Sequence, residues 1–242
     1  MKALIDGDIV AFMCAASAEN DDEAWIPNSR ADNLIDRILQ ETESDEYEVW
    51  LSGDNNFRYQ VYPEYKANRI DTYRPKWEKE VKEHLRKEWQ ANTAHGCEGD
   101  DYLGIRQYDL SGHNFSIGDK HSVICTIDKD LNQIPGWHYS WELTKLGKVI
   151  RPAKIWFITP EEATRFFYTQ LLVGDPTDNI KGVPGIVPKK AEKLLQDTNP
   201  EEMLQIVRDQ YSCDEELEMN AQVLYIRHKP EEMWSLNEAK IS

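Results

Sequence analysis

The sequence predicts an α/β fold with a mostly parallel central sheet flanked by helices, followed by an all-helical C-terminal region. Residues 1–158 alternate short apolar runs with amphipathic stretches, and the order strand, helix, strand is typical of parallel pairing. Beyond residue 158 the patterns of the chain are helical only. We therefore predict a first domain over residues 1–158 and a helical region over residues 159–242.

The first domain begins with the apolar run Ala3-Leu4-Ile5, which indicates a buried strand ending at Asp6-Gly7-Asp8. Helices with one apolar side are expected next, separated by further short strands. The predicted helices cover residues 9–18, 32–40 and 75–90, with another beginning at residue 98. The predicted strands cover residues 47–51 and 121–126, with candidates at residues 137–143 and 154–158.

The helical region opens with the motif Thr159-Pro160-Glu161-Glu162. Thr as cap, Pro at the first position and Glu reaching back form a strong helix start. A connector rich in glycine and proline follows at residues 174–188. The predicted helices cover residues 160–173, 189–196 and 201–210, with a last one from about residue 214.

The composition restricts the classes of function. The 242 residues include 28 basic and 44 acidic side chains, a net charge of −16, which argues against a protein that coats DNA. Hydrophobic residues make up 40%, enough for a core. None of the four cysteines lies in a CxxC pair, so a zinc knuckle is not supported and reduced thiols in a cytoplasm are expected. Neither a secretory signal nor an apolar stretch long enough to cross a bilayer is found, so we expect no membrane association.

Three aspartates, Asp6, Asp54 and Asp128, each follow a predicted strand. Side chains at the carboxyl ends of parallel strands converge on one crevice, where ligands bind. A single aspartate there is usually a turn or capping residue. Three of them in one chain favour a shared site instead.

Further acids occur in short clusters, which are Glu98, Asp100 and Asp101; Asp128 and Asp130; and Asp175 and Asp178. Acids are common at helix starts, but so many carboxylates together are unfavourable without a counter-charge. Oxygen ligands without His or Cys select hard ions such as Mg²⁺ or Mn²⁺. Two such ions roughly 4 Å apart can activate a water and stabilise the leaving oxygen of a phosphodiester. The spacing alone therefore predicts an acidic metal site and leaves the substrate open.

The sequence resembles a known family, the 5′-nucleases that include flap endonucleases and bacteriophage 5′–3′ exonucleases. Six segments carry the resemblance in the same order: Ile5-Asp6-Gly7; Gly53-Asp54 with Phe57-Arg58; Tyr65-Lys66-Ala67-Asn68-Arg69; Glu98-Gly99-Asp100-Asp101; Asp128-Lys129-Asp130; and residues 174–186. The resemblance covers the chain from Ile5 to about Leu195. It implies a PIN-like nuclease core with a helical arch at about residues 58–90, and a duplex-binding helix–three-turn–helix element within residues 159–242.

The resemblance also implies the roles of individual residues. The implied metal ligands are Asp6, Asp54, Glu98, Asp100, Asp101, Asp128, Asp130, Asp175 and Asp178, which would hold two ions. Lys66 and Arg69 match basic residues at the base of the arch, where a cation can hold the scissile phosphate. Two solvated surface cations are the alternative interpretation of this pair. Asp8 departs from the commoner small polar residue of the family.

Contacts to nucleic acid are implied in two regions. In the arch, Arg58 would track the backbone and Tyr65 would stack on an unpaired base, whereas Trp77, Val81, Leu85 and Trp89 are interpreted as ordinary helix core. In the helix–three-turn–helix element, Gly182, Gly185, Lys189 and Lys190 would approach duplex phosphates, and the loop could hold K⁺. Val187 stands where a third glycine is common, and a plain helix-packing turn remains the alternative.

The function that the resemblance implies is metal-dependent hydrolysis of DNA at or near 5′ ends, as a 5′–3′ exonuclease, a flap endonuclease or both. RNA in RNA–DNA hybrids is a further possible substrate. We expect a monomer, encoded by a phage and working in the bacterial host cytoplasm.

Two alternatives stay open. One is a phosphatase similar to haloacid dehalogenases, with Asp6 as nucleophile and Asp8 as acid/base, but it leaves the motifs at residues 65–69 and 98–101 unexplained. The other is a non-catalytic DNA-binding module.

Overall fold

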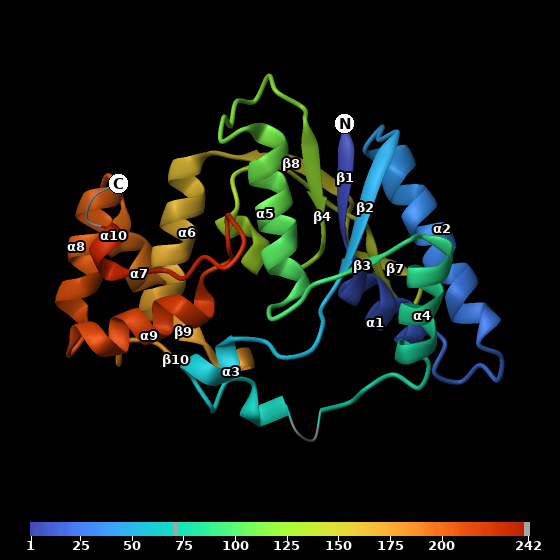
Figure 1. Ribbon diagram of the computed structural model, residues 1–242, viewed down its shortest axis with the longest axis horizontal. Coiled ribbons are helices and arrows are strands. Elements are labelled where there is room, and N and C mark those ends of the chain that lie inside the picture. Colours follow the sequence, from blue (N-terminus) through green and yellow to red (C-terminus); the bar gives the residue numbers. More distant parts are fainter. Residues whose placement is uncertain (70–71, 240–242) are drawn as a thin grey trace.

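The computed structural model describes residues 1–69 and 72–239, and these residues fold around a six-stranded sheet (Figure 1). The strand order is β3-β2-β1-β4-β5-β8. The strands are β1 (Lys2–Asp6), β2 (Glu46–Leu51), β3 (Asn92–Thr93), β4 (Ser122–Cys125), β5 (Gly136–Ser140) and β8 (Lys154–Ile158). All neighbours pair in parallel except the edge strand β8, which is antiparallel to β5. The predicted mostly parallel sheet is confirmed.

Helices cover both faces of the sheet because β1 is apolar on both of its sides. Ala3 and Ile5 face a core shared with α1 (Gly7–Ser17), α2 (Trp25–Glu41) and α4 (Glu78–Glu88). Leu4 points the opposite way, to a core shared with α5 (Gly99–Ser111). Val81 and Leu85 of α4 are fully buried, and Trp77 and Trp89 pack partly buried beside them. Their interpretation as helix core is therefore confirmed.

The chain beyond residue 158 is helical, apart from a short two-stranded pair. Its helices are α6 (Pro160–Val173), α7 (Pro188–Leu195), α8 (Pro200–Gln210), α9 (Asp214–Leu224) and α10 (Leu236–Ala239). The predicted cap of α6 is present: the Glu162 amide donates to the Thr159 hydroxyl at 3.2 Å, and the Thr159 amide donates to the Glu162 carboxylate at 2.8 Å. No helix within the described ranges is long and apolar enough to cross a membrane.

The C-terminal segment returns to the sheet after α9, beside α5 (Figure 1). Ile226 packs with Leu4 and Leu103 in the core between the sheet and α5. A Cβ atom on Gly104 of α5 would lie 2.6 Å from the Arg227 carbonyl oxygen, so glycine is needed for this close approach. Residues on both sides of the predicted boundary at 158 thus share one core.

Several local elements differ from the expectation. The predicted strand 137–143 is divided between β5 and a separate hairpin of β6 (Leu143–Lys145) and β7 (Lys148–Arg151). The hairpin turns at Leu146 and Gly147, whose φ angles are 50° and 73°. In the predicted arch, α3 (Arg58–Val61) and the 3₁₀ turn Ala67–Arg69 precede α4, and Ile70 and Asp71 lie outside the described residues.

Candidate metal and nucleic-acid site

A cavity of about 500 Å³ lies at the carboxyl ends of β1 and β4. Acidic side chains from separate elements line it, namely Asp6, Asp8, Glu78, Glu98, Asp100, Asp128, Asp130, Asp175 and Asp178. The structure therefore brings seven of the nine predicted metal ligands to one place, and Asp8 joins them. The carboxyl ends of the parallel strands lie beside the N-terminus of α5, and this arrangement brings the acids together.

Asp6 is fixed at the end of β1 by two hydrogen bonds. Its carboxylate accepts from the Ile9 amide at 3.0 Å, which caps α1, and from the Thr126 hydroxyl at 2.8 Å. The Thr126 hydroxyl in turn accepts from the Asp128 amide at 3.0 Å, so it joins the ends of β1 and β4. Burial, together with the charge of Asp8, raises the pKa of Asp6 to about 7.

Glu98 and Asp100 enter the cavity from the start of α5. The Gly99 amide between them donates to the Ser52 hydroxyl at 2.9 Å, which fixes the helix start against the end of β2. Burial raises the pKa of Asp100 well above its usual range, and the charges of Asp6 and Asp128 act in the same direction. The acids thus repel one another across the cavity.

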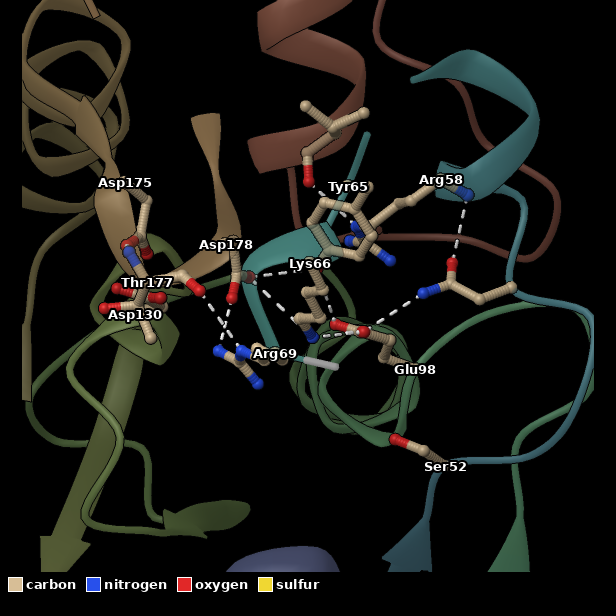
Figure 2. Close-up of polar contacts among 12 residues, drawn as sticks. Ser52, Arg58, Tyr65, Lys66, Arg69, Glu98, Asp130, Asp175, Thr177 and Asp178 are labelled. Atoms are coloured by element: carbon tan, nitrogen blue, oxygen red, sulfur yellow. Dashed lines mark hydrogen bonds and ion pairs between the residues drawn. The ribbon is translucent and has the colours of Figure 1, made fainter. Parts of the chain in front are cut away.

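Asp130 and Asp175 form the opposite side of the cavity and lie together in Figure 2. Asp130 accepts from the Gln170 amide at 2.8 Å, and its own backbone amide donates to Asp128 at 2.9 Å. Asp175 ends the short strand β9 (Gly174–Asp175) and accepts from the Thr177 amide at 2.8 Å. Burial, then the charges of Asp128 and Asp175, raise the pKa of Asp130 to about 7.

Lys66 and Arg69 reach the same cavity, and Lys66 points between Glu98 and Asp178 (Figure 2). The Lys66 ammonium lies 2.5 Å from Glu98 Oε1 and 3.7 Å from Asp178 Oδ2. The Arg69 guanidinium forms an ion pair with Asp178. Lys66 has a φ angle of 55°, which a lysine rarely adopts, and its amide donates to the Asp178 carbonyl at 2.9 Å. A strained backbone at this position indicates that the location of the side chain matters.

The donor chemistry of the cavity fits a hard divalent cation. Its acids offer only oxygen ligands, and burial, followed by the charges of neighbouring acids, raises the pKa values of Asp6, Asp100 and Asp130. Within the described residues no three such side chains converge closely enough to enclose an ion as they stand. Mg²⁺ keeps several waters and is commonly bound through one or two carboxylates, so a dedicated cage is not required.

Two predicted ligands lie outside the cavity. Asp54 is exposed in a separate shallow hollow formed by residues 53–56 and 59–60. Asp101 is completely buried and is bound at both carboxylate oxygens by Arg58, at 2.6 and 2.9 Å. Burial acts to raise the pKa of Asp101, but the charge and hydrogen bonds of Arg58 outweigh it and lower that pKa. Asp101 therefore behaves as the anchor of an arginine.

Arg58 and Tyr65 are not placed where the expectation of nucleic-acid contacts requires. Arg58 is 2% exposed and also donates to the carbonyls of Val223 and Tyr225, both at 2.8 Å. Tyr65 is 2% exposed, and its hydroxyl donates to Asp178 at 3.0 Å. Both side chains border the acidic cavity, but at this exposure they offer very little surface to a phosphate or a base.

The expected duplex-binding element lies away from the acidic cavity. Lys189 and Lys190 are exposed in the first turn of α7, and the Lys190 amide already donates to the Val187 carbonyl at 2.8 Å. Gly185 has a φ angle of 77° in an open turn. Close packing explains why residue 182 is glycine, because a Cβ atom there would lie 2.2 Å from the Val173 carbonyl carbon.

Two residues of the cavity, Gln170 and Lys82, were missed at the level of sequence, as was Thr126, whose hydroxyl donates to Asp6. Gln170 is polar on the buried side of α6, beside Leu171, and that contrast was a usable signal. Lys82 pairs with Asp8 at 2.8 Å, but nothing in the pattern of α4 distinguishes it from other surface lysines.

Comparison with known proteins gives relatives among nucleases and polymerases, and no protein-family model matches the chain. The exodeoxyribonuclease of Enterobacteria phage T3 is 28% identical over 200 residues, covering 75% of this chain and 62% of the relative. The exonuclease of Escherichia phage T7 is 26% identical, with the same coverage. DNA polymerase I of Bacillus caldotenax is 29% identical over 209 residues, covering 80% of this chain and 23% of the polymerase. The match thus spans less than two thirds of the length of each relative.

Solved structures share the fold. The bacteriophage T5 flap endonuclease, crystallised with DNA and metal ions, has a TM-score of 0.65 at 18% identity over 92% of this chain and 88% of that chain. The T5 5′-exonuclease with bound zinc has a TM-score of 0.63 at 18% identity over 93% of this chain and 89% of that chain. The mostly parallel sheet flanked by helices that is expected from the sequence is therefore a fold that these structures share.

Proposed function

We propose that this chain, a relative of the 5′-nuclease family, is a metal-dependent hydrolase that cleaves DNA phosphodiester bonds at or near 5′ ends. One observation carries the proposal. Seven acids that are far apart in sequence line one cavity together with Lys66 and Arg69. Carboxylates for hard cations beside two fixed positive charges are what phosphoryl-transfer chemistry needs.

The acids would divide between two ion positions. We assign Asp6, Glu98 and Asp100, from β1 and the start of α5, to the first position, and Asp128, Asp130, Asp175 and Asp178 to the second. Two Mg²⁺ or Mn²⁺ ions, when bound there, would supply an activated water and neutralise charge at the phosphate. Asp54 and Asp101 are left out of this set because of their positions.

Lys66 and Arg69 would bind the scissile phosphate. In the structure their charges are directed at Glu98 and Asp178. Once cations compensate those carboxylates, the ammonium and the guanidinium are free to turn their donors to phosphate oxygens. Gln170 and Thr126 would keep Asp130 and Asp6 oriented while this exchange takes place.

The substrate class follows from the relatives. Two are named as exonucleases, and the T5 flap endonuclease was crystallised with DNA. We infer a duplex with a 5′ end or flap as the substrate, and RNA–DNA hybrids as a second one. Lys189 and Lys190 would contact duplex phosphates, and the loop before α7 could hold K⁺. A monomer in a bacterial host cytoplasm is consistent with three buried cysteines and with the phage relatives.

Replacing Asp130 by Asn tests the site. The change removes one charge without altering shape, and we expect the cleavage rate in Mg²⁺ to fall at least about a hundredfold while binding is retained. The measurement is product formation from 5′-labelled flap, blunt and nicked duplexes. Asp36→Asn is the matched control, because Asp36 is exposed on α2. Normal cleavage by Asp130→Asn would refute the assignment, and product lengths would distinguish exonuclease from flap cleavage.

A further inference from the structure

A second cavity, which we call the side cavity, lies next to the acidic one and shares Asp128 and Lys129 with it. Its volume is about 370 Å³. Part of its wall comes from the loop after β4, and the rest from the end of β7 and the start of β8, including Arg151, Lys154 and Trp156. It therefore opens beside the proposed position of the scissile phosphate.

The charge of the side cavity is opposite to that of its neighbour. Its charged lining residues are three cations, Lys129, Arg151 and Lys154, and one acid, Asp128. None of these cations forms a salt bridge among residues 1–69 and 72–239. In a chain with a net charge of −16, such a local positive surface attracts a polyanion to the edge of an otherwise repulsive site.

Arg151 offers hydrogen-bond donors without a partner. Its Nη1 makes a long contact of 3.5 Å to the Ile127 carbonyl, whereas Nε and Nη2 are buried without a hydrogen-bond partner in the described part of the chain. Leaving buried donors unpaired is costly. Nε and Nη2 together form one planar edge of the guanidinium, which matches two oxygens of a phosphate.

Trp156 supplies a rigid flat surface in the same cavity. Its ring stacks on that of His138, with centroids 5.6 Å apart and an angle of 23° between the planes, and Lys154 Nζ lies 5.2 Å from the centroid of the same ring, so that a base would stack there in place of this ammonium. His138 is 1% exposed, so it fixes the tryptophan from the interior. A fixed aromatic ring beside cationic side chains is the combination that proteins use to bind unpaired nucleotides.

We propose that the side cavity binds the nucleotide adjoining the scissile phosphate on the cleaved strand. Arg151 holds the phosphate of that nucleotide, Trp156 stacks on its base, and Lys129 and Lys154 attract the strand. The identity of the neighbouring cavity as the cleavage site rests on the proposed function. The proposed contacts of the cations and of Trp156 with a nucleotide depend only on the residues of the side cavity.

A scan of neutralised phosphates tests the proposal. The probe is a 5′-fluorescent duplex carrying one methylphosphonate at successive positions, and its binding is followed by anisotropy in EDTA, where cleavage is absent. Arg151→Gln and Lys154→Gln should each weaken binding roughly three- to tenfold and reduce the salt slope by about one. One methylphosphonate should weaken binding to the wild type and leave binding to Arg151→Gln unchanged. Lys148→Gln, exposed on β7 outside the cavity, is the control and should change binding less than about twofold.

Each result decides the question. Wild-type affinity for both Arg151→Gln and Lys154→Gln, or no position whose effect disappears in Arg151→Gln, overturns the proposal. Lys154 is exposed, so its variant remains informative even if Arg151→Gln fails to fold. If deoxyadenosine monophosphate binds as tightly as the duplex and depends on Arg151, the site takes free nucleotides, and the assignment to a strand is wrong.

A separate cleavage assay of the wild type in Mg²⁺ distinguishes the two claims. Cleavage with no effect of the side-cavity variants on binding contradicts this inference alone. The expected binding pattern without cleavage supports this inference and contradicts the proposed function.

Discussion

Arg58 and Asp101 form a two-point ion pair that is almost completely removed from solvent. Burying two charges is expensive, and the cost is offset only when their remaining hydrogen bonds are satisfied. Here the Val223 and Tyr225 carbonyls accept from Arg58, and the Arg227 amide donates to Asp101 at 3.2 Å. The pair thus joins α3 at the start of the predicted arch, the start of α5 and the end of α9.

Replacing Arg58 by Met should therefore destabilise the fold strongly. The change leaves the Asp101 charge buried without its partner, and we expect the free energy of unfolding to fall by about 3–5 kcal/mol. Urea unfolding in EDTA measures this. The double variant Arg58→Met with Asp101→Leu removes both charges and should recover part of the loss. A loss below about 1 kcal/mol in the single variant would contradict the role given to the pair.

At the scale of single residues, the sequence could not always predict which partners a side chain contacts. Asp6 and Asp128 follow strand ends and line the acidic cavity as expected, whereas Asp54 also follows a strand and lies outside that cavity. Arg58 was expected at nucleic acid, and its burial depends on carbonyls 165 and 167 residues further along the chain. No local pattern encodes a contact of that separation.

At the scale of elements, the segment carrying Asp175 and Asp178 is held by a tight crossing of backbone. Strand β9 pairs with β10 (Ile180–Lys181), and Gly174 and Gly182 face each other where the pair leaves α6. A Cβ on Gly182 would lie 2.2 Å from the Val173 carbonyl carbon and 2.4 Å from the Gly174 nitrogen. The glycine therefore sets how closely this segment approaches α6.

Gly182→Ala should push the β9–β10 pair away from α6. We expect a loss of about 2–4 kcal/mol in unfolding free energy, with reduced cleavage because Asp175 moves. Gly185→Ala is the comparison: its φ of 77° costs about 1–2 kcal/mol, but the space around it is open. Thermal unfolding and cleavage rates measure both. Equal behaviour of the two variants would show that the crossing is not the constraint.

Element positions were predictable where a period or a cap was strong, as in α6 and β8. The hairpin of β6 and β7 was missed because its residues are exposed, so no buried face imposes a pattern on them. The short turns α3 and Ala67–Arg69 have too few residues for any period to appear.

For the whole molecule, the free energy of unfolding depends on pH through buried groups that act in opposite directions. Burial lowers the pKa of His138 from 6.5 to about 4, whereas the pKa values of Asp6 and Asp130 are raised from 3.8 to about 7. The histidine contribution is complete above pH 6.5 and is lost as the pH falls toward 4. The two aspartates do the reverse, because protonation relieves their buried charge.

The variant His138→Gln isolates the contribution of His138 to the pH dependence of stability. Between pH 7 and pH 4 the wild type should lose about 3 kcal/mol of stability relative to His138→Gln, which keeps a donor for the Ile134 carbonyl. Urea unfolding of both proteins in EDTA across this range measures the difference. His95→Gln, exposed in a loop, should run parallel to the wild type. Parallel curves for His138→Gln and the wild type would exclude the buried neutral histidine as the cause.

The wall of the acidic cavity includes Val223, Leu224 and Ile226, and Arg58 is tied to the same stretch. A ribosome releases the carboxylates of β1 and α5 long before it releases these residues. The acidic cavity therefore lacks this part of its wall until these residues have been synthesised. Under the proposed function, synthesis from the N-terminus therefore delays assembly of the active site until residues 223–226 have been made.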